Sequence, residues 1–518
     1  MKIHRTKNAG RNIFFGLLLK LYQILAPFLL RTAMIYWMGV EYLGLDSLFT
    51  SILQVLNLAE LGVGSAMVYG MYRPIAEDDK TAICALMKLY RIYYRVIGGV
   101  IAVIGLAITP LIPILIKSDL PSGLNIYVLY WLNLAATVCS YWLFAYKNAL
   151  FQAHQRVDIT SKVSLFTYTL RYGAQLLVIY LLKNYYLYIM VALITQLLTN
   201  VITAAAAEKM YPDYHPHGSL KPSQVHQING RIRDLFTSKL GAVIVNSTDT
   251  VVISAFLGLT TLALYQNYFF ILTALIGLIT VLFQACTAGI GNSVIVESKE
   301  KNYSDLKKFT FLIVWLSGFC TCSLLCLYQP FMKLWVGEQL LLGFPAVICF
   351  CIYFFVYEIN QLLNTYKDAA GIWHQDRFRP LVTSLSNLIM NLILVRFWGI
   401  YGVLLSTVLS TLLIGMPWLL YNLFHILFDP RYLPNYLKRL ARYAAVVLLS
   451  CLATFVICQT LQLPDILTLA LRLVICGIAP NLIYWFIYRR QEEFAQCVLL
   501  ADRLTGGKLR LQRFFRTN

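Results

Sequence analysis

The stretch KMYPDYHPHGSLKPSQVHQINGRIR, Lys209–Arg233, divides an otherwise apolar chain of 518 residues. It is the one long polar interruption, because 59% of all residues are hydrophobic and only 13% are charged. A soluble domain averages roughly 25% charged residues. This composition predicts an all-α integral membrane protein, for which the bilayer rather than water is the solvent.

Apolar runs that are long enough to cross a bilayer lie on both sides of this stretch. A helical span needs about 20 mainly apolar residues, and on that scale we expect about 14 transmembrane helices. The expected spans are 12–36, 45–70, 92–116, 124–146, 160–181, 186–208, 234–257, 262–290, 308–328, 345–365, 380–397, 401–424, 441–460 and 466–488.

The polar stretch separates six of these spans from six more, and a further pair follows. Each set of six begins and ends on the same side of the membrane, so we expect two six-helix bundles in parallel pseudo-repeat. The expected parts are an N-terminal six-helix bundle (1–208), a cytoplasmic linker (209–233), a C-terminal six-helix bundle (234–425), an additional C-terminal helix pair (438–488) and a basic cytoplasmic tail (489–518).

The positive charges give the expected orientation. With the N-terminus inside, most of the 43 Lys and Arg fall in the tails and in the loops on that side, which is typical of a cytoplasmic face. Both termini are therefore expected to be cytoplasmic. The net charge of +19 is expected to face anionic membrane lipids, and no nucleic-acid partner is expected.

The first expected span carries two positive side chains on one face. Lys20 and Arg31 lie only about 20° apart around a helix and about 16 Å apart along it. A charge in the middle of a span costs roughly 2.5–3.5 kcal/mol on insertion scales. One interpretation is that both side chains extend to the membrane interfaces. The other is that they face water, a partner charge or a ligand.

Polar residues in three further spans favour the second interpretation. Asp46 and Asn57 fall close to one angular position on the second span, with Glu60 beside them. For Glu60 or Asp249 taken alone, a structural salt bridge across helices is nearly as good an account as a role in substrate binding. Taken together, the polar positions predict a hydrated central cavity between the two bundles. The seventh and eighth spans contribute Lys239, Asn246, Asp249, Gln266 and Asn267.

Three stretches resemble a known family. They are YLGLDSLFTSILQVLNLAELGVGSAMVYGMYRPIAEDD (42–79), SYWLFAYKNALFQAHQR (140–156) and STDTVVISAFLGLTTLALYQNY (247–268). They are similar to polysaccharide flippases of the multidrug/oligosaccharidyl-lipid/polysaccharide exporter superfamily, of the Gram-positive capsule type. The resemblance implies a protein of the bacterial plasma membrane that moves undecaprenyl-pyrophosphate-linked oligosaccharides from the inner to the outer leaflet by alternating access.

The resemblance also implies roles and partners. Arg31 matches the basic position of the first helix motif, and Glu60, Lys147 and Asp249 match further positions. We expect Arg31, Lys20 and Arg171 to meet the anionic headgroup, since arginine offers forked donors to phosphate oxygens. Membrane lipids, a polysaccharide polymerase and glycosyltransferases are the expected partners.

Two alternatives stay open on the sequence. A multidrug or cation antiporter of the same fold would prefer an acidic cavity, and the basic stripe favours the flippase. A membrane glycosyltransferase or polysaccharide polymerase would need a sizeable extracytoplasmic loop with catalytic side chains. The longest such loop, 329–344, has only Lys333 and Glu338 as charged residues. We therefore expect a protein that is not an enzyme.

No cofactor or metal is expected. Nearly all of the 12 cysteines fall within expected spans, where cysteine acts as a small apolar residue, and no paired CxxC spacing predicts a zinc site. Transport could be coupled to a cation or proton bound by Glu60 or Asp249, or to the membrane potential.

Overall fold

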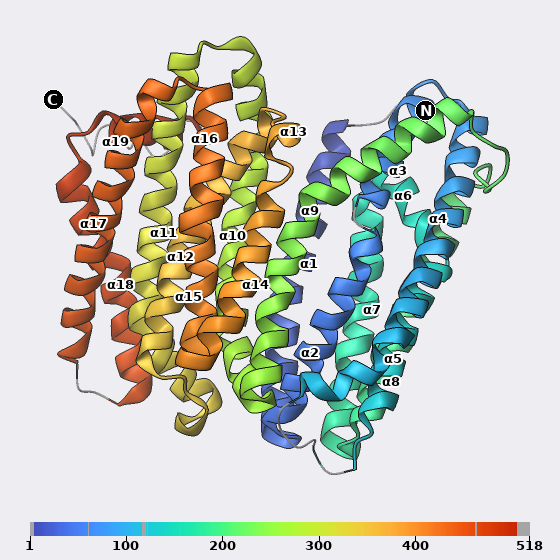
Figure 1. The fold of residues 1–518 in the computed structure, drawn as a ribbon, viewed down its shortest axis with the longest axis horizontal. Helices are drawn as coiled ribbons and strands as arrows, with labels where there is room; N and C mark the ends of the chain where they lie inside the picture. The colour runs from blue at the N-terminus through green and yellow to red at the C-terminus, as the bar shows by residue number, and fades with distance from the viewer. Residues whose placement is uncertain are drawn as a thin grey trace. The chain divides into compact units, whose positions relative to one another are not determined.

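A computed structural model gives the fold of the chain (Figure 1). It describes residues 5–504 except 61, 117–120, 122, 155 and 462–463, and it leaves some side chains within helices undescribed, including those of Lys239 and Asn246. The described part is helical throughout and contains no strand. Contacts group the chain into two compact units, Met1–Ala263 (unit 1) and Leu264–Asn518 (unit 2).

Unit 1 contains nine α-helices and four short helical segments within the described residues. Its long helices run roughly side by side (Figure 1). In chain order they are α1 (Arg5–Trp37), α2 (Val40–Leu56), the 3₁₀ turn η1 (Asn57–Glu60), α3 (Val63–Ala76), α4 (Lys80–Ile108), η2 (Thr109–Leu115), α5 (Ile126–Trp142), η3 (Ala145–Lys147), α6 (Asn148–Ala153), α7 (Val157–Leu177), the π-helical η4 (Val178–Leu182), α8 (Tyr185–Met210) and α9 (Pro222–Leu257).

Helix α10 (Leu259–Val296) begins in the last residues of unit 1 and continues into unit 2. The remaining helices of unit 2 are α11 (Lys299–Val336), η5 (Glu338–Leu340), α12 (Phe344–Ala369), α13 (Trp373–Asp376), α14 (Arg379–Trp398), α15 (Ile400–Ser410), η6 (Thr411–Gly415), α16 (Met416–Ile426), η7 (Pro430–Tyr432), α17 (Leu433–Gln459), α18 (Asp465–Tyr488) and α19 (Glu492–Leu504).

The expectation of an all-α integral membrane fold is confirmed. Among the described residues, 11 helices are long and apolar enough to cross a membrane, or 12 when the bent pair Ile126–Trp142 and Ala145–Ala153 is counted as one span. Every expected span contains a helix. The second and seventh expected spans are not among these helices. The second is broken at η1, and within its described residues α9 contributes the shorter apolar segment Ser247–Leu257.

The connection between α8 and α9 within the polar stretch 209–233 is short. Helix α8 continues to Met210 and α9 begins at Pro222. Within the polar stretch, residues 211–221 therefore form the loop between the two helices. Proline at a first helical position favours a helix start, because its missing N–H would have no partner there.

An ion pair connects this loop to the start of α4. Lys80 Nζ lies 2.6 Å from Asp213 Oδ2, and this ion pair lowers the pKa of the exposed Asp213 carboxyl.

Close approach of α2 to the start of α10 fixes one corner of unit 1. A Cβ on Gly44 would collide with the backbone carbonyl of Leu259. Glycine at this position therefore lets the two backbones pack directly.

In unit 2 the last two long helices pack against α11 (Figure 1). The Thr310 and Tyr436 hydroxyls, from α11 and α17, lie 2.9 Å apart. On the α18 side, Trp315 Nε1 donates to Asn481 Oδ1 at 2.7 Å. These polar contacts fix the helix pair to the bundle, since a hydrogen bond in an apolar environment has no competing water.

Candidate functional site: a polar cavity in unit 1

The second expected span is broken in the middle. Helix α2 ends at Leu56, η1 follows, and α3 begins at Val63. Gly62 precedes α3 with a φ of +89°, a left-handed conformation that costs a residue with a Cβ roughly 1–2 kcal/mol. The sequence LNLAELGVG supplies a glycine where the backbone needs one. The break brings Glu60 and the first residues of α3 to one place.

The fourth expected span is broken as well. Helix α5 ends at Trp142, Phe144 adopts a φ of +60°, and the chain resumes through η3 and α6. The two parts are bent by 49°. Discontinuous helices at membrane depth are typical of transporter binding sites, because they free backbone polar groups to line a cavity.

The two breaks border one cavity of about 500 Å³. Glu60 is the only charged residue among its described lining residues. The lining otherwise consists mainly of hydroxyl, amide and aromatic side chains, which can both donate and accept hydrogen bonds. The cavity is lined by Glu60, Gly62, Gly64, Ser65, Tyr90, Tyr94, Ser140, Tyr141, Phe144, Ala145, Asn148, Ala149, Gln152, Thr160, Ser164, Tyr168, Gln196, Thr199, Asn200 and Thr203.

Three tyrosines hold the residues of the first break. Tyr94 donates a hydrogen bond of 2.8 Å to Glu60 Oε1, and the Tyr90 hydroxyl donates to that of Tyr94 at 2.6 Å. Tyr141 donates to Asn57 Oδ1 at 3.2 Å. The rings of Tyr94 and Tyr141 meet edge to face at 5.3 Å. Because each hydroxyl has a partner in this network, the Glu60 carboxylate is held in one orientation.

Helix α7 extends the polar lining beyond the cavity. Thr160, Ser164 and Tyr168 line the cavity and are spaced four residues apart, so they share one face of the helix. Arg171 and Gln175 continue that face by three and then four residues. Arg171 therefore lies only about 4.5 Å further along the helix axis than Tyr168.

Arg171 belongs to a group of three charges. Asp46 on α2 interacts electrostatically with both Arg171 and Arg31, and all three side chains are half-buried. The group contains two positive charges and one negative charge, which leaves one positive charge in excess. A carboxylate that interacts with two arginines lowers the cost of placing either one at membrane depth.

Buried polar contacts support Arg171 from α7 and α8. Its Nε donates to Gln175 Oε1 at 3.3 Å. Gln175 is fully buried, and its Nε2 donates to the Tyr188 carbonyl at 3.1 Å. The guanidinium also lies 5.8 Å from the centre of the Tyr172 ring. These contacts keep Arg171 on the polar face of α7.

The structure places the other expected site residues of unit 1 in several positions. Lys20 is exposed on α1. Lys147 in η3 is buried and paired with Glu208 of α8; its neighbours Ala145 and Asn148 line the cavity. Asn57 lies at the first break and accepts the Tyr141 hydrogen bond. Asp249 on α9 is 7% exposed.

The remaining expected residues divide between the two units. Lys239 and Asn246 lie on α9, but their side chains are outside the described set. Gln266 and Asn267 lie on α10 within unit 2, where Asn267 is fully buried and Gln266 half-buried. The structure thus places Glu60 in the cavity lining with Asn57 in the same turn η1, and it brings Arg31 and Arg171 into electrostatic interaction with Asp46.

Sequence reasoning missed the tyrosines and the α8 residues of the cavity. Tyr90 and Tyr94 stand four residues apart on α4, as Gln196 and Asn200 do on α8. Pairs of polar side chains with this spacing inside apolar spans are the signal that could have identified them. The role of Asp46 as the acidic partner of two arginines depends on tertiary packing.

Comparisons with known proteins bear on the fold. No protein-family model and no curated protein matches the chain. Among solved structures, it is similar to the lipid II flippase MurJ in an inward closed conformation, with a TM-score of 0.69 and 15% identity over 92% of this chain and 99% of that chain. The similarity of fold therefore extends over nearly the full length of both proteins.

Two further structures share the arrangement. An inward-facing multidrug resistance MATE family transporter of the MOP superfamily matches with a TM-score of 0.60 and 14% identity, over 80% of this chain and 98% of that one. A MOP superfamily transporter from Pyrococcus furiosus, described as having a binding pocket of reverse polarity, matches at 0.53 and 14%, over 83% and 96%. The chain has the helical membrane fold seen in MOP superfamily transporters.

Proposed function

We propose that the protein is a flippase that moves undecaprenyl-pyrophosphate-linked oligosaccharide repeat units from the inner to the outer leaflet for capsular or exopolysaccharide assembly. The observation that carries the proposal is the polar face of α7. It runs from the uncharged hydroxyl and amide lining of the cavity to Arg171 and the excess positive charge around Asp46. A sugar and a phosphate need these two environments side by side.

The cavity suits the oligosaccharide. Sugars present many hydroxyl groups, and the hydroxyl and amide side chains of the lining can donate hydrogen bonds to them or accept hydrogen bonds from them. Tyr168 and Phe144 add aromatic faces. Ligand cavities usually measure roughly 300–1,000 Å³, so about 500 Å³ accommodates part of a repeat unit.

The arginines suit the pyrophosphate. An uncompensated anion in an apolar medium is very costly, and arginine offers paired donors that match phosphate oxygens. Arg31 and Arg171 together exceed the charge of Asp46 by one. In this proposal the headgroup is stabilised by that excess while the prenyl chain stays in lipid, and alternating access moves the headgroup between leaflets.

A cation antiporter is the second candidate, and one observation favours it. Glu60 is the only charged residue among the described lining residues of the cavity, and a carboxylate at membrane depth can bind a cation or a proton. The MATE transporter similarity fits this candidate as well. In the flippase proposal Glu60 or Asp249 instead binds the coupling ion, or the membrane potential drives the cycle at about 2.3 kcal/mol per charge per 100 mV.

The experiment that tests the proposal uses the full chain in liposomes. Fluorescent undecaprenyl-pyrophosphate oligosaccharides are placed in both leaflets, and a membrane-impermeant quencher reports which molecules reach the outside. Protein-containing vesicles are expected to expose the whole pool, whereas empty vesicles expose only the outer half. Arg31→Ala is expected to slow the exchange.

A cationic dye tested in the same vesicles separates the two candidates. Dye transport driven by a proton or sodium gradient, without any exchange of the lipid-linked sugar, would overturn the flippase proposal.

The proposal also implies partner enzymes. A flippase is expected to act on glycans that glycosyltransferases complete at the inner leaflet and to supply a polymerase at the outer leaflet.

A further inference from the structure

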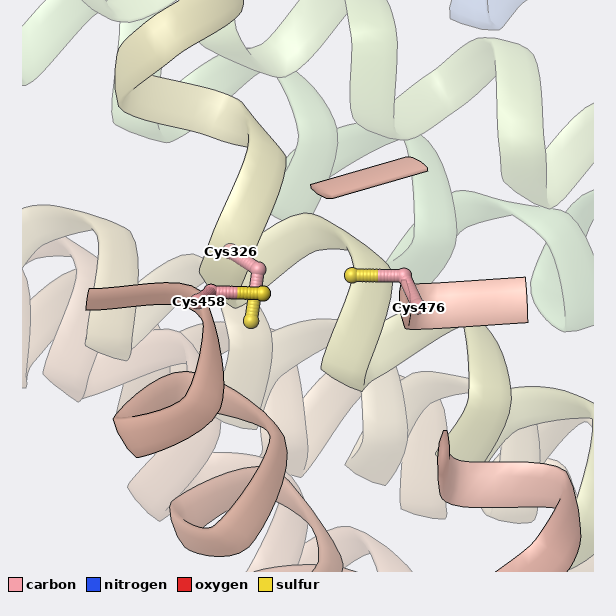
Figure 2. Close-up of side chains that lie close together, drawn as sticks. All are labelled: Cys326, Cys458 and Cys476. Carbon is pink, nitrogen blue, oxygen red and sulfur yellow. The ribbon is translucent and has the colours of Figure 1, made fainter. Parts of the chain in front are cut away.

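Three cysteines that are far apart in the sequence converge in unit 2. Cys326 lies on α11, Cys458 on α17 and Cys476 on α18, and their sulfur atoms all lie within 4.8 Å of one another. Figure 2 shows the Cys476 sulfur directed toward those of Cys326 and Cys458. All three thiols are free, and the residues are at most 1% exposed.

We propose that Cys326, Cys458 and Cys476 form a binding site for one soft, thiophilic metal ion, and that Cu(I) is the ion that fits it. The inference is independent of the proposed transport function. Cysteine sulfur favours soft ions such as Cu(I) over hard ions such as Mg²⁺ or Ca²⁺. Each of the three helices contributes one cysteine, so the site has no metal-binding motif that could be recognised from residue spacing in the sequence.

The distances suit a single ion. Metal–sulfur bonds measure about 2.3 Å, so three sulfurs arranged around one ion in a plane are about 4 Å apart. The sulfurs here are separated by 4.8 Å at most. Small rotations of the cysteine side chains are therefore sufficient to close the site, and no helix needs to move.

The number of ligands favours Cu(I) over Zn²⁺. Structural zinc sites are almost always four-coordinate, and within the described residues this cluster offers three Cys, His, Asp or Glu ligands. Apolar side chains pack around it, namely Leu327, Phe455 and Ile475. This shell disfavours a water molecule as the fourth zinc ligand, whereas Cu(I) is stable with three sulfur ligands.

A positive charge stands beside the sulfurs. Arg472 lies one helical turn before Cys476 on α18 and interacts electrostatically with Cys458 and Cys476. Its Nη1 donates to the Cys326 carbonyl at 3.4 Å, and its buried Nε has no hydrogen-bond partner among the described residues. An arginine within a membrane span is costly unless it faces an anion. Thiolates at this site would provide that anion.

Binding changes protonation but not oxidation state. Each thiol that coordinates the ion loses its proton to solution as a sulfur–copper bond forms. Three thiolates and Cu(I) carry two negative charges in sum, and Arg472 offsets one of them. The bound ion would join α17 and α18 to α11, so it is expected to stabilise the attachment of the C-terminal helix pair.

The test is a Cu(I) titration of the purified full-length protein in detergent, without oxygen and against a competing Cu(I) chelator. One ion per chain is expected to be retained. Serine at any of the three positions, Cys326→Ser, Cys458→Ser or Cys476→Ser, is expected to weaken binding at least tenfold. Bound copper should also raise the unfolding temperature of the wild type and show three sulfur ligands at about 2.3 Å by X-ray absorption.

Two control variants define the site. Cys139→Ser removes a thiol from α5 in unit 1, and Cys322→Ser removes a thiol whose sulfur lies 3.3 Å from that of Cys451. Both are expected to bind copper as the wild type does. Gel filtration shows whether each variant is folded. If a buried serine hydroxyl impairs folding, the test is repeated with alanine at the three site positions.

Three results would overturn the inference. The first is a folded wild type that retains no Cu(I). The second is unchanged affinity when all three cysteines are replaced. The third is Zn²⁺ binding that is as tight as Cu(I) binding, which would contradict the choice of ion.

Discussion

Tyr94 of α4 donates a hydrogen bond of 2.8 Å to Glu60, across the break between α2 and α3. The contact joins a residue of a continuous helix to the charged residue of a broken one. Since Tyr90 donates in turn to Tyr94, the orientation of the Glu60 carboxylate depends on two side chains that are four residues apart on α4. The cavity in unit 1 is therefore held by a short hydrogen-bond chain rather than by apolar packing alone.

Removing the charge of Glu60 tests the role of this chain. Glu60→Gln keeps the size of the side chain, and Tyr94→Phe removes the donor. Hydrogen bonds to charged groups contribute roughly 1.5–3 kcal/mol, so we expect Tyr94→Phe to slow transport in proteoliposomes about tenfold and Glu60→Gln to slow it at least as much. Tyr93→Phe, on the neighbouring position that instead contacts Asn229, is the control and should be close to wild type. Normal rates for both cavity variants would remove the network from the mechanism.

Asp46 and Arg171 are expected to be energetically coupled. Arg171→Gln leaves Asp46 with less compensation, and Asp46→Asn leaves two arginines near each other without their anion. We expect each single change to lower the unfolding temperature in detergent, and the double variant to lose less than the sum. A coupling of about 0.5–3 kcal/mol is typical of residues in one charge network. Strict additivity of the two changes would show that the charges do not act on one another.

Gly62 is expected to be intolerant of a side chain. Its φ of +89° disfavours any residue with a Cβ, so Gly62→Ala should destabilise unit 1 by roughly 1–3 kcal/mol. The matched control is Gly99→Ala within α4, where an added Cβ meets no atom within 4 Å. Helix propensity predicts that this control is neutral or slightly stabilising. Equal unfolding temperatures for the two variants would contradict the account of the break.

His154 is expected to make stability depend on pH. Burial lowers the pKa of its imidazole, and the ring packs in a tilted arrangement against Tyr211 and Tyr214, with centroid distances of 4.4 and 5.7 Å. The unfolded chain binds the proton more readily, so stability is complete above the ordinary pKa of about 6.5 and falls as the pH decreases below it. One proton contributes at most about 1.4 kcal/mol per pH unit.

Thermal unfolding between pH 8 and pH 5 measures this effect. His154→Gln should flatten the profile, whereas His226→Gln, an exposed histidine on α9, should leave it unchanged. A profile for His154→Gln as steep as that of the wild type would assign the pH dependence to other groups.

Hydropathy alone was sufficient to predict most of the fold. Each expected span contains a helix, because about 20 apolar residues leave few other structures in a bilayer. The breaks at Gly62 and Phe144 were not predicted, since an averaged window over an apolar run does not register one change of backbone conformation. The start of α9 at Pro222 was missed because a polar helix lacks the apolar signal.

The candidate site could be predicted only in part. Charged residues such as Glu60 and Arg31 are conspicuous inside apolar spans. In the structure Glu60 accepts a hydrogen bond from Tyr94, and Arg31 interacts electrostatically with Asp46. Which residues meet could not be inferred from one sequence. Asp46 and Arg171 are far apart in the chain, and the Cys326, Cys458 and Cys476 cluster draws on three helices with no shared spacing.

The central claim is that the polar face of α7, with Arg171, serves the transport of lipid-linked oligosaccharide. The most direct test compares the exchange rate of that substrate in proteoliposomes between Arg171→Gln and Arg396→Gln. Both changes remove one arginine from a membrane helix, but Arg171 continues the polar face of α7 and Arg396 is exposed on α14. The account predicts an exchange at least tenfold slower for Arg171→Gln and a nearly normal rate for Arg396→Gln. Equal rates for the two folded variants would contradict it.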